Sequence, residues 1–192
     1  MQVSRFFSGT HTVIFALVAC FASFSAQGAT PLPTMVDPNL QICLTEQANR
    51  NGWQSAEQVT QLDCSGRGVT RLEGIEGLFV LAALDLSNNA IIDAWPLSAL
   101  RTLTKLNLSG NRSIDIMQVR PVLDMNWGLT SLGLNGIRIG AFGNLGALFN
   151  PQTGRPYDLV ELDLGNSGLT DLAGNKSLDF LQPYANLTRL NV

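Results

Sequence analysis

A triplet of the form Leu-x-Leu, with small variations in its last residue, recurs six times along the chain. The triplets are Leu62-Asp63-Cys64, Leu84-Asp85-Leu86, Leu106-Asn107-Leu108, Leu132-Gly133-Leu134, Leu162-Asp163-Leu164 and Leu190-Asn191-Val192. Their first residues are 22, 22, 26, 30 and 28 positions apart, and an apolar residue stands three positions before each of them. An apolar pattern repeated at this period is typical of a solenoid, in which each coil is too small to bury its own core and stability comes from stacking on neighbours.

One coil can be derived from the triplet. On a short strand, alternation sends the two leucines inward and leaves the middle residue on the open face. Three residues after the triplet, at the ninth position counted from the preceding apolar residue, stand Asn89 and Asn111. A side-chain amide there can bond backbone groups of its own coil and the adjoining coil that the turn would leave unpaired, so we expect a structural asparagine ladder. Arg67, Ile137 and Ser167 replace asparagine in other coils, and their turns need other partners.

The stretch LAALDLSNNAIIDAWPLSAL, from Leu81 to Leu100, matches the pattern L-x-x-L-x-L-x-x-N-x-I-x-D-x-x-P-L-x-x-L at every fixed position. In this pattern the chain, from about Val59 to Val192, resembles bacterial leucine-rich repeat proteins of the internalin type. The resemblance implies an α/β fold: a leucine-rich repeat solenoid with a curved parallel sheet on the concave side and short helices or loops on the convex side. The last two full repeats are long, and residues 177–182 are the best candidate for a helical turn there. Because this superfold serves many unrelated roles, the resemblance is weak for function.

Residues 37–58 are predicted to form an N-terminal cap. Asp37 suits the N-cap of a helix, Pro38 its first position and Gly52 the residue just past its end. Its expected apolar face consists of Leu40, Cys43, Leu44 and Ala48. Cys43 and Cys64 would both point into the junction between this helix and the first coil, which in an oxidising compartment favours a disulfide. Two separate buried thiols remain the alternative, whereas a zinc site lacks a third cysteine or histidine nearby.

The first 28 residues carry an uncharged apolar run that is too short for an ordinary membrane span, which is typical of a signal peptide. Cleavage is expected near Gly28 and Ala29, and residues 29–36 would be a linker. A competing interpretation is a lipobox, residues 17–20, in which Cys20 would be lipidated and become residue one. A buried N-terminal helix is the third alternative. The first two interpretations predict a secreted, periplasmic or outer-envelope protein, with membrane contact only through lipidation.

The composition excludes several kinds of chemistry. The net charge of -3 includes no block of like charge, so nucleic acid is not an expected partner. The one histidine, His11, lies in the predicted signal peptide. The mature chain would therefore lack a histidine for a catalytic triad, a general base or a metal ligand. We predict neither an enzyme nor a cofactor.

The open face of the strands is the predicted binding surface. Its candidate ligand-binding residues are Asp63, Asp85, Lys105, Asn107 and Glu161. Two interpretations of these residues remain open. They form a binding site, for a protein or for a cationic or basic ligand, or they form a solvated acidic stripe that binds nothing. No aromatic residue falls on the first five strands of this face; those on the flanks, including Trp95 and Trp127, are expected mostly in the convex-side core.

These observations predict a noncatalytic interaction module that is secreted or associated with the envelope and binds its ligand on the concave face. The alternative from another class is a structural or accessory envelope protein that self-associates. Its contact would be the C-terminal edge at residues 190–192, where the sequence offers no recognisable cap.

Overall fold

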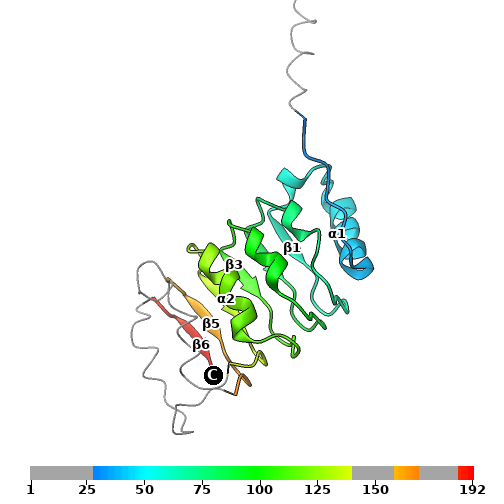
Figure 1. The fold of residues 1–192 in the computed structure, drawn as a ribbon. Helices are drawn as coiled ribbons and strands as arrows, with labels where there is room; N and C mark the ends of the chain where they lie inside the picture. Colours follow the sequence, from blue (N-terminus) through cyan, green and yellow to red (C-terminus); the bar gives the residue numbers. More distant parts are fainter. Residues whose placement is uncertain (1–27, 140–157, 169–185) are drawn as a thin grey trace, which may run out of the picture.

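The computed structural model describes residues 28–139, 158–168 and 186–192. Within these ranges, the six triplets lie in six parallel strands of one sheet, ordered as in the chain (Figure 1). The strands are β1 (Gln61–Asp63), β2 (Ala83–Asp85), β3 (Lys105–Asn107), β4 (Ser131–Gly133), β5 (Glu161–Asp163) and β6 (Arg189–Asn191). The first leucines of the triplets are register partners from each strand to the next, so the predicted solenoid is confirmed.

The core is a stack of inward-pointing leucines closed by the convex segments. The central leucines of β1 to β5 are at most 2% exposed. The convex segments are η2 (Ile75–Gly77), η3 (Trp95–Ala99) and α2 (Ile116–Met125), while η1 (Ala56–Gln58) precedes the first coil. Asp115 caps α2 by accepting hydrogen bonds from Met117 N and Gln118 N, and Val119, Val122 and Leu123 face the core. The predicted helical turn at 177–182 lies outside the described residues.

Helix α1 (Pro38–Asn51) covers the first coil as predicted (Figure 1). Asp37 accepts hydrogen bonds from Asn39 N and Leu40 N, and Gly52 ends the helix in the left-handed conformation at φ 72°. Its buried residues are the four predicted: Leu40, Cys43, Leu44 and Ala48. The helix therefore seals the apolar end of the stack.

Asp37 also ties the cap to the first coil. Its Oδ2 accepts hydrogen bonds from Thr70 N (2.8 Å), Thr70 Oγ1 (2.8 Å) and Arg71 N (3.1 Å). Burial alone would raise the pKa of Asp37, but hydrogen bonds from Thr70, Arg71 and Leu40 outweigh burial and hold the pKa below its usual value of 3.8. A single buried carboxylate thus joins α1 to residues 70–71.

Residues 33–36 lie against the convex side of the first coil. Val36 N donates to Glu73 O (2.9 Å), and Met35 is only 4% exposed. The approach is so close that a Cβ at Gly74, where φ is 101°, would lie 2.3 Å from Thr34 O. Residues 1–27, which include nearly all of the predicted signal peptide and the lipobox, lie outside the described residues. None of the described helices has the length and apolar character needed to cross a bilayer.

Two aromatic residues expected in the core are exposed instead. Trp95 is 63% exposed and Trp127 is 51% exposed. Leu97 and Leu100, which are fully buried, supply the core contacts of this segment in place of the indole. Trp127 is held at the surface because its Nε1 donates to Asp124 O (2.6 Å) at the end of α2. The prediction of burial was wrong for both tryptophans.

Candidate functional site

The concave face consists of the first and third residues of each strand, and it forms an open groove. The groove has a volume of about 690 Å³ and draws side chains from all six described strands. Its charged groups are four carboxylates (Asp63, Asp85, Glu161, Asp163) and two cations (Lys105, Arg189). The five predicted ligand-binding residues all line this one groove.

Four middle residues of the triplets share a structural role that the sequence analysis missed. Oδ1 of Asp63 accepts a hydrogen bond from Ser65 N (3.0 Å), and Oδ1 of Asp85 accepts one from Ser87 N (2.8 Å). Asn107 and Asp163 bond in the same way to the N–H two residues later. Each side chain therefore fixes the turn that ends its strand with one oxygen. The periodic Asp or Asn in the triplet was the available signal.

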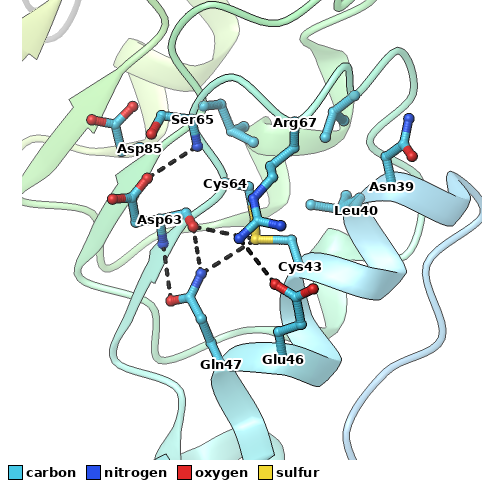
Figure 2. Close-up of a disulfide and its surroundings, with 12 residues drawn as sticks. Asn39, Leu40, Cys43, Glu46, Gln47, Asp63, Cys64, Ser65, Arg67 and Asp85 are labelled. Carbon is cyan, nitrogen blue, oxygen red and sulfur yellow. Dashed lines mark hydrogen bonds and ion pairs between the residues drawn. A yellow bond between two sulfur atoms is a disulfide. The ribbon is translucent and has the colours of Figure 1, made fainter. Parts of the chain in front are cut away.

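The Oδ2 atoms of Asp63 and Asp85, which do not bond to the turns, differ in their hydrogen bonds. Asp85 Oδ2 accepts from Asn107 Nδ2 (3.0 Å), whereas Asp63 Oδ2 has no hydrogen-bond donor among the described residues. Asp63 and Asp85 are register partners on β1 and β2. In Figure 2 their carboxylates project in the same direction from the two strands. In the described ranges, neither is ion-paired to a cation.

Toward β5 and β6, the carboxylates of the groove accept hydrogen bonds from neighbouring side chains. Glu161 accepts hydrogen bonds from Ser131 Oγ (2.9 Å) and Arg189 Nη1 (2.7 Å). Asp163 accepts from the side-chain amides of Asn135 (3.2 Å) and Asn191 (2.9 Å). Glu161 and Asp163 thus accept hydrogen bonds from other side chains, whereas the Asp63 carboxylate accepts only the backbone N–H of Ser65 among the described residues.

Gly133, on β4, lines the groove at a position where a side chain would not fit. A Cβ built there would lie 2.3 Å from Oδ1 of Asn107, so the absent side chain leaves space for the Asn107 amide. Lys105, the first residue of β3, is exposed and has Ala83 and Ser131 as its register partners. Its ammonium group is therefore not enclosed by larger side chains on either neighbouring strand.

The predicted disulfide joins Cys43 of α1 to Cys64 directly after β1, with 5.8 Å between the Cα atoms (Figure 2). One turn further along α1, the Gln47 amide donates to Asp63 O and accepts from Asp63 N (3.3 Å). Glu46 forms an ion pair with Arg67 (2.9 Å) beyond the strand. The cap therefore holds the backbone on both sides of the Asp63 carboxylate.

Asn89 and Asn111 bond to two coils each. Nδ2 of Asn89 donates to Cys64 O (2.9 Å) and Leu86 O (2.8 Å), while its Oδ1 accepts from Val69 N (3.0 Å). Asn111, which is fully buried, repeats this arrangement one coil later.

A third buried asparagine was not identified from the sequence. Asn126 donates to Leu100 O and Val122 O (both 2.8 Å) and accepts from Leu103 N (2.9 Å). It stands at the end of α2, away from the ninth position of any coil, so the repeat pattern gave no signal for it.

No group of three histidine, cysteine or acidic side chains in the described ranges is arranged to hold a metal ion. The disulfide consumes both cysteines of the cap junction. The groove offers carboxylates, amides, hydroxyls and one lysine without an ion pair in the described part of the chain, which suit reversible binding of a polar ligand.

Comparison with known proteins identifies a structural likeness. No protein-family model matches the chain, and no curated protein matches it. An internalin (InlF) from Listeria monocytogenes matches with a TM-score of 0.59 and 25% sequence identity, over 86% of this chain and 46% of the internalin. Internalin C2 from the same organism matches with a TM-score of 0.58 and 23% identity, over 85% of this chain and 79% of its own. The chain thus spans less than half of the InlF structure.

Proposed function

We propose that this chain, which has the internalin-type leucine-rich repeat fold, is a noncatalytic binding module whose concave face takes a protein segment with basic side chains. The pair formed by Asp63 and Asp85 carries the proposal. The two carboxylates stand on adjacent strands, whose backbones are about 5 Å apart, and neither is ion-paired within the described residues. A guanidinium or ammonium group bound across them relieves their mutual repulsion.

The other charges of the groove indicate how the proposed ligand is oriented along it. Glu161 and Arg189 are already paired at 2.7 Å, so they contribute little free charge. Lys105 on β3 is the next free charge after the acidic pair. A complementary segment places its basic group over β1 and β2 and an acidic or polar group over β3. Since these charges are exposed, binding weakens as the salt concentration rises.

The proposal includes a location outside the cytoplasm, in a secreted, periplasmic or outer-envelope form. The disulfide between Cys43 and Cys64 supports it, because such bonds persist mainly in oxidising compartments. Whether the N-terminus is cleaved or lipidated at Cys20 is decided by the mass of the mature protein.

Selection from a displayed library of random peptides tests the binding proposal. Peptides retained by the wild-type chain are expected to be enriched in lysine and arginine. The variant Asp63→Asn with Asp85→Asn is expected to lose this enrichment. Asparagine keeps the turn-fixing oxygen, as Asn107 does naturally, so the variant removes charge without removing the turn.

Glu76→Gln with Asp93→Asn is the matched control on the convex side. Both carboxylates accept a local backbone N–H, which the amides also bond, and the loss of charge equals that in the test variant. The control is expected to retain the basic peptides. Equal retention by the Asp63 and Asp85 variant, or no basic enrichment with the wild type, would contradict the proposal.

Self-association through β6 is the second candidate function. Leu190 is 42% exposed, whereas its register partner Leu162 is 2% exposed. Sedimentation of the purified chain at increasing concentration distinguishes the two functions. A monomer at all concentrations favours the interaction module, while an oligomer that Leu190→Lys disperses favours self-association.

A further inference from the structure

Two arginines stand at the same repeat position in consecutive coils, on the edge where the strands turn. Arg112 follows Asn111 and Arg138 follows Ile137, so each is the residue directly after the ninth position of its coil. Gly110 N donates to Asn135 O (2.7 Å), which joins the two turns just before the arginines. Both arginines contribute to the lining of one depression at this edge.

The second depression, which both arginines line, adjoins the acidic groove and shares three lining residues with it. Its volume is about 740 Å³, and its lining includes the turn residues Gly110 and Gly136, whose φ angles are 81° and 74°. Both arginines are exposed, and neither forms a salt bridge with any carboxylate in the described parts of the chain. Two cations in one depression that form no salt bridge attract an anion.

The nearby carboxylates are engaged elsewhere. Asp163, the one acidic residue in the lining, accepts hydrogen bonds from Gly165 N, Asn135 and Asn191. Asp115, whose backbone forms a bridge with Arg138, accepts from Met117 N and Gln118 N at the start of α2. Neither carboxylate therefore neutralises the arginines by direct pairing.

Neutral donors complete the depression. Ser109 Oγ accepts from Asn135 N (3.1 Å), which leaves its own hydroxyl hydrogen available. Asn88 also lines the depression, and its Nδ2 has no acceptor among the described residues. An oxyanion has several acceptor oxygens, so it can take bonds from two guanidinium forks together with a hydroxyl and an amide.

We propose that this depression, lined by Arg112 and Arg138, binds a phosphate or sulfate group. The forked guanidinium groups suit the geometry of such oxyanions better than point charges do. The group can come from a free ion or from an ester carried on a polymer. This site lies beyond the proposed function, because its arginines carry a charge opposite to that of the acidic pair and follow the turns after β3 and β4.

Titration calorimetry with the full chain tests the site, using inorganic phosphate and a soluble phosphodiester oligomer as probes. Arg112→Gln with Arg138→Gln is expected to weaken binding by about tenfold or more, as expected for lost hydrogen bonds to a charged group. Arg50→Gln with Arg101→Gln is the charge-matched control, because both residues are exposed and have no salt bridge in the described ranges. The control is expected to bind as the wild type does.

Each result has a defined meaning. Binding of both probes with similar affinity supports a site for the free ion, and binding of the oligomer alone supports a polymer-borne ester. Arg112→Lys with Arg138→Lys keeps the charge but removes the forks, so an intermediate affinity supports recognition by geometry. An equal loss in the Arg50 and Arg101 control, or no binding of either probe by a wild-type chain with an unchanged circular dichroism spectrum, overturns the proposal.

Discussion

The N-terminal and C-terminal coils have the same strand geometry but hold their turns in different ways. From β1 to β3 the strands are 22 residues apart, and Asn89 and Asn111 each bond back to the coil before them. From β3 onward the spacing is longer, and Ile137 and Ser167 occupy the ninth position. Their turns retain the backbone bonds from Ile137 N to Leu134 O (3.0 Å) and from Ser167 N to Leu164 O (3.2 Å). The turn itself therefore does not require asparagine.

The difference is explained by the coil that the ninth residue faces. In the two 22-residue coils, Val69 and Ile91 stand two residues after the ninth position and present a buried N–H to the asparagine of the next coil. In the following coil that place belongs to Ser113, which is exposed, and the buried residue comes one position later, at Ile114. An asparagine at position 137 would thus lack its usual donor, and a buried isoleucine serves the core better.

The largest effect is expected from removing the disulfide between Cys43 and Cys64. Within the described residues, this bond is present only at the N-terminal end of the sheet. Cys43→Ala with Cys64→Ala is expected to lower the free energy of unfolding by about 3 kcal/mol, because the bond restricts the unfolded chain. Urea unfolding of the wild type with and without reductant measures the same difference. Equal midpoints in the two conditions would show that the link adds nothing to the N-terminal coils.

Asn111→Ala tests the asparagine bonds directly. The change leaves Ile91 N without its side-chain acceptor and removes one of the two side-chain donors to Leu86 O, at a cost of about 2 kcal/mol. Thermal unfolding followed by circular dichroism measures it. An unchanged melting temperature would mean that the backbone bonds suffice in every coil, as they do around Ile137.

Asp37→Asn sharpens the comparison at the cap, where one carboxylate bonds both α1 and residues 70–71. The folded-state pKa of Asp37 is below its usual value of 3.8, because hydrogen bonds outweigh the effect of burial, which would raise it. The carboxylate therefore stabilises the fold above pH 3.8, and this contribution is lost as the pH falls through the folded-state pKa.

Asparagine remains a good N-cap but cannot carry the charge, so the Asp37→Asn variant should be less stable than the wild type at pH 7 by about 1 kcal/mol. The difference should disappear at low pH. Unfolding midpoints of both proteins across the acidic range measure this convergence, and parallel curves at all pH values would contradict the assignment.

Ser167→Ala has the smallest expected effect. Ser167 is 3% exposed, and its Oγ has no hydrogen-bond partner among the described residues. Removing this hydroxyl should leave the unfolding free energy unchanged or raise it by up to about 1 kcal/mol. A clear loss of stability in chemical denaturation would instead reveal that the C-terminal turns do depend on a polar side chain.

The sequence predicted those parts of the molecule that recur or carry a local signal. The leucine triplets set the strand register, Asp37 and Gly52 bound α1, and the inward positions of Cys43 and Cys64 led to the disulfide. The predicted binding residues were assigned to one face by alternation alone, and the structure brings them into one groove. Their role in binding stays a prediction.

The sequence analysis missed hydrogen bonds between distant residues that are not part of the repeat pattern. Asn126 bonds to residues 100 and 103 across one coil, and Asp37 bonds to residues 70 and 71, at separations that no periodic pattern reveals. Trp95 and Trp127 were assigned to the core because large aromatics are usually buried. In these coils the buried core is formed by leucines and other aliphatic residues, so the general preference of aromatics for burial did not predict where Trp95 and Trp127 lie.

The bond between Cys43 and Cys64 also determines how the molecule responds to mechanical tension. A force pulling on residue 36 would normally peel α1 away from the sheet before it reached β1. With the two cysteines joined, the load passes directly from Cys43 to Cys64, and the 21-residue separation between them contributes no extension. Roughly 70 Å of chain is thereby shielded from stretching. Strand β1, in which Asp63 lies next to the disulfide, therefore keeps its geometry under a force that would detach α1 if the disulfide were absent.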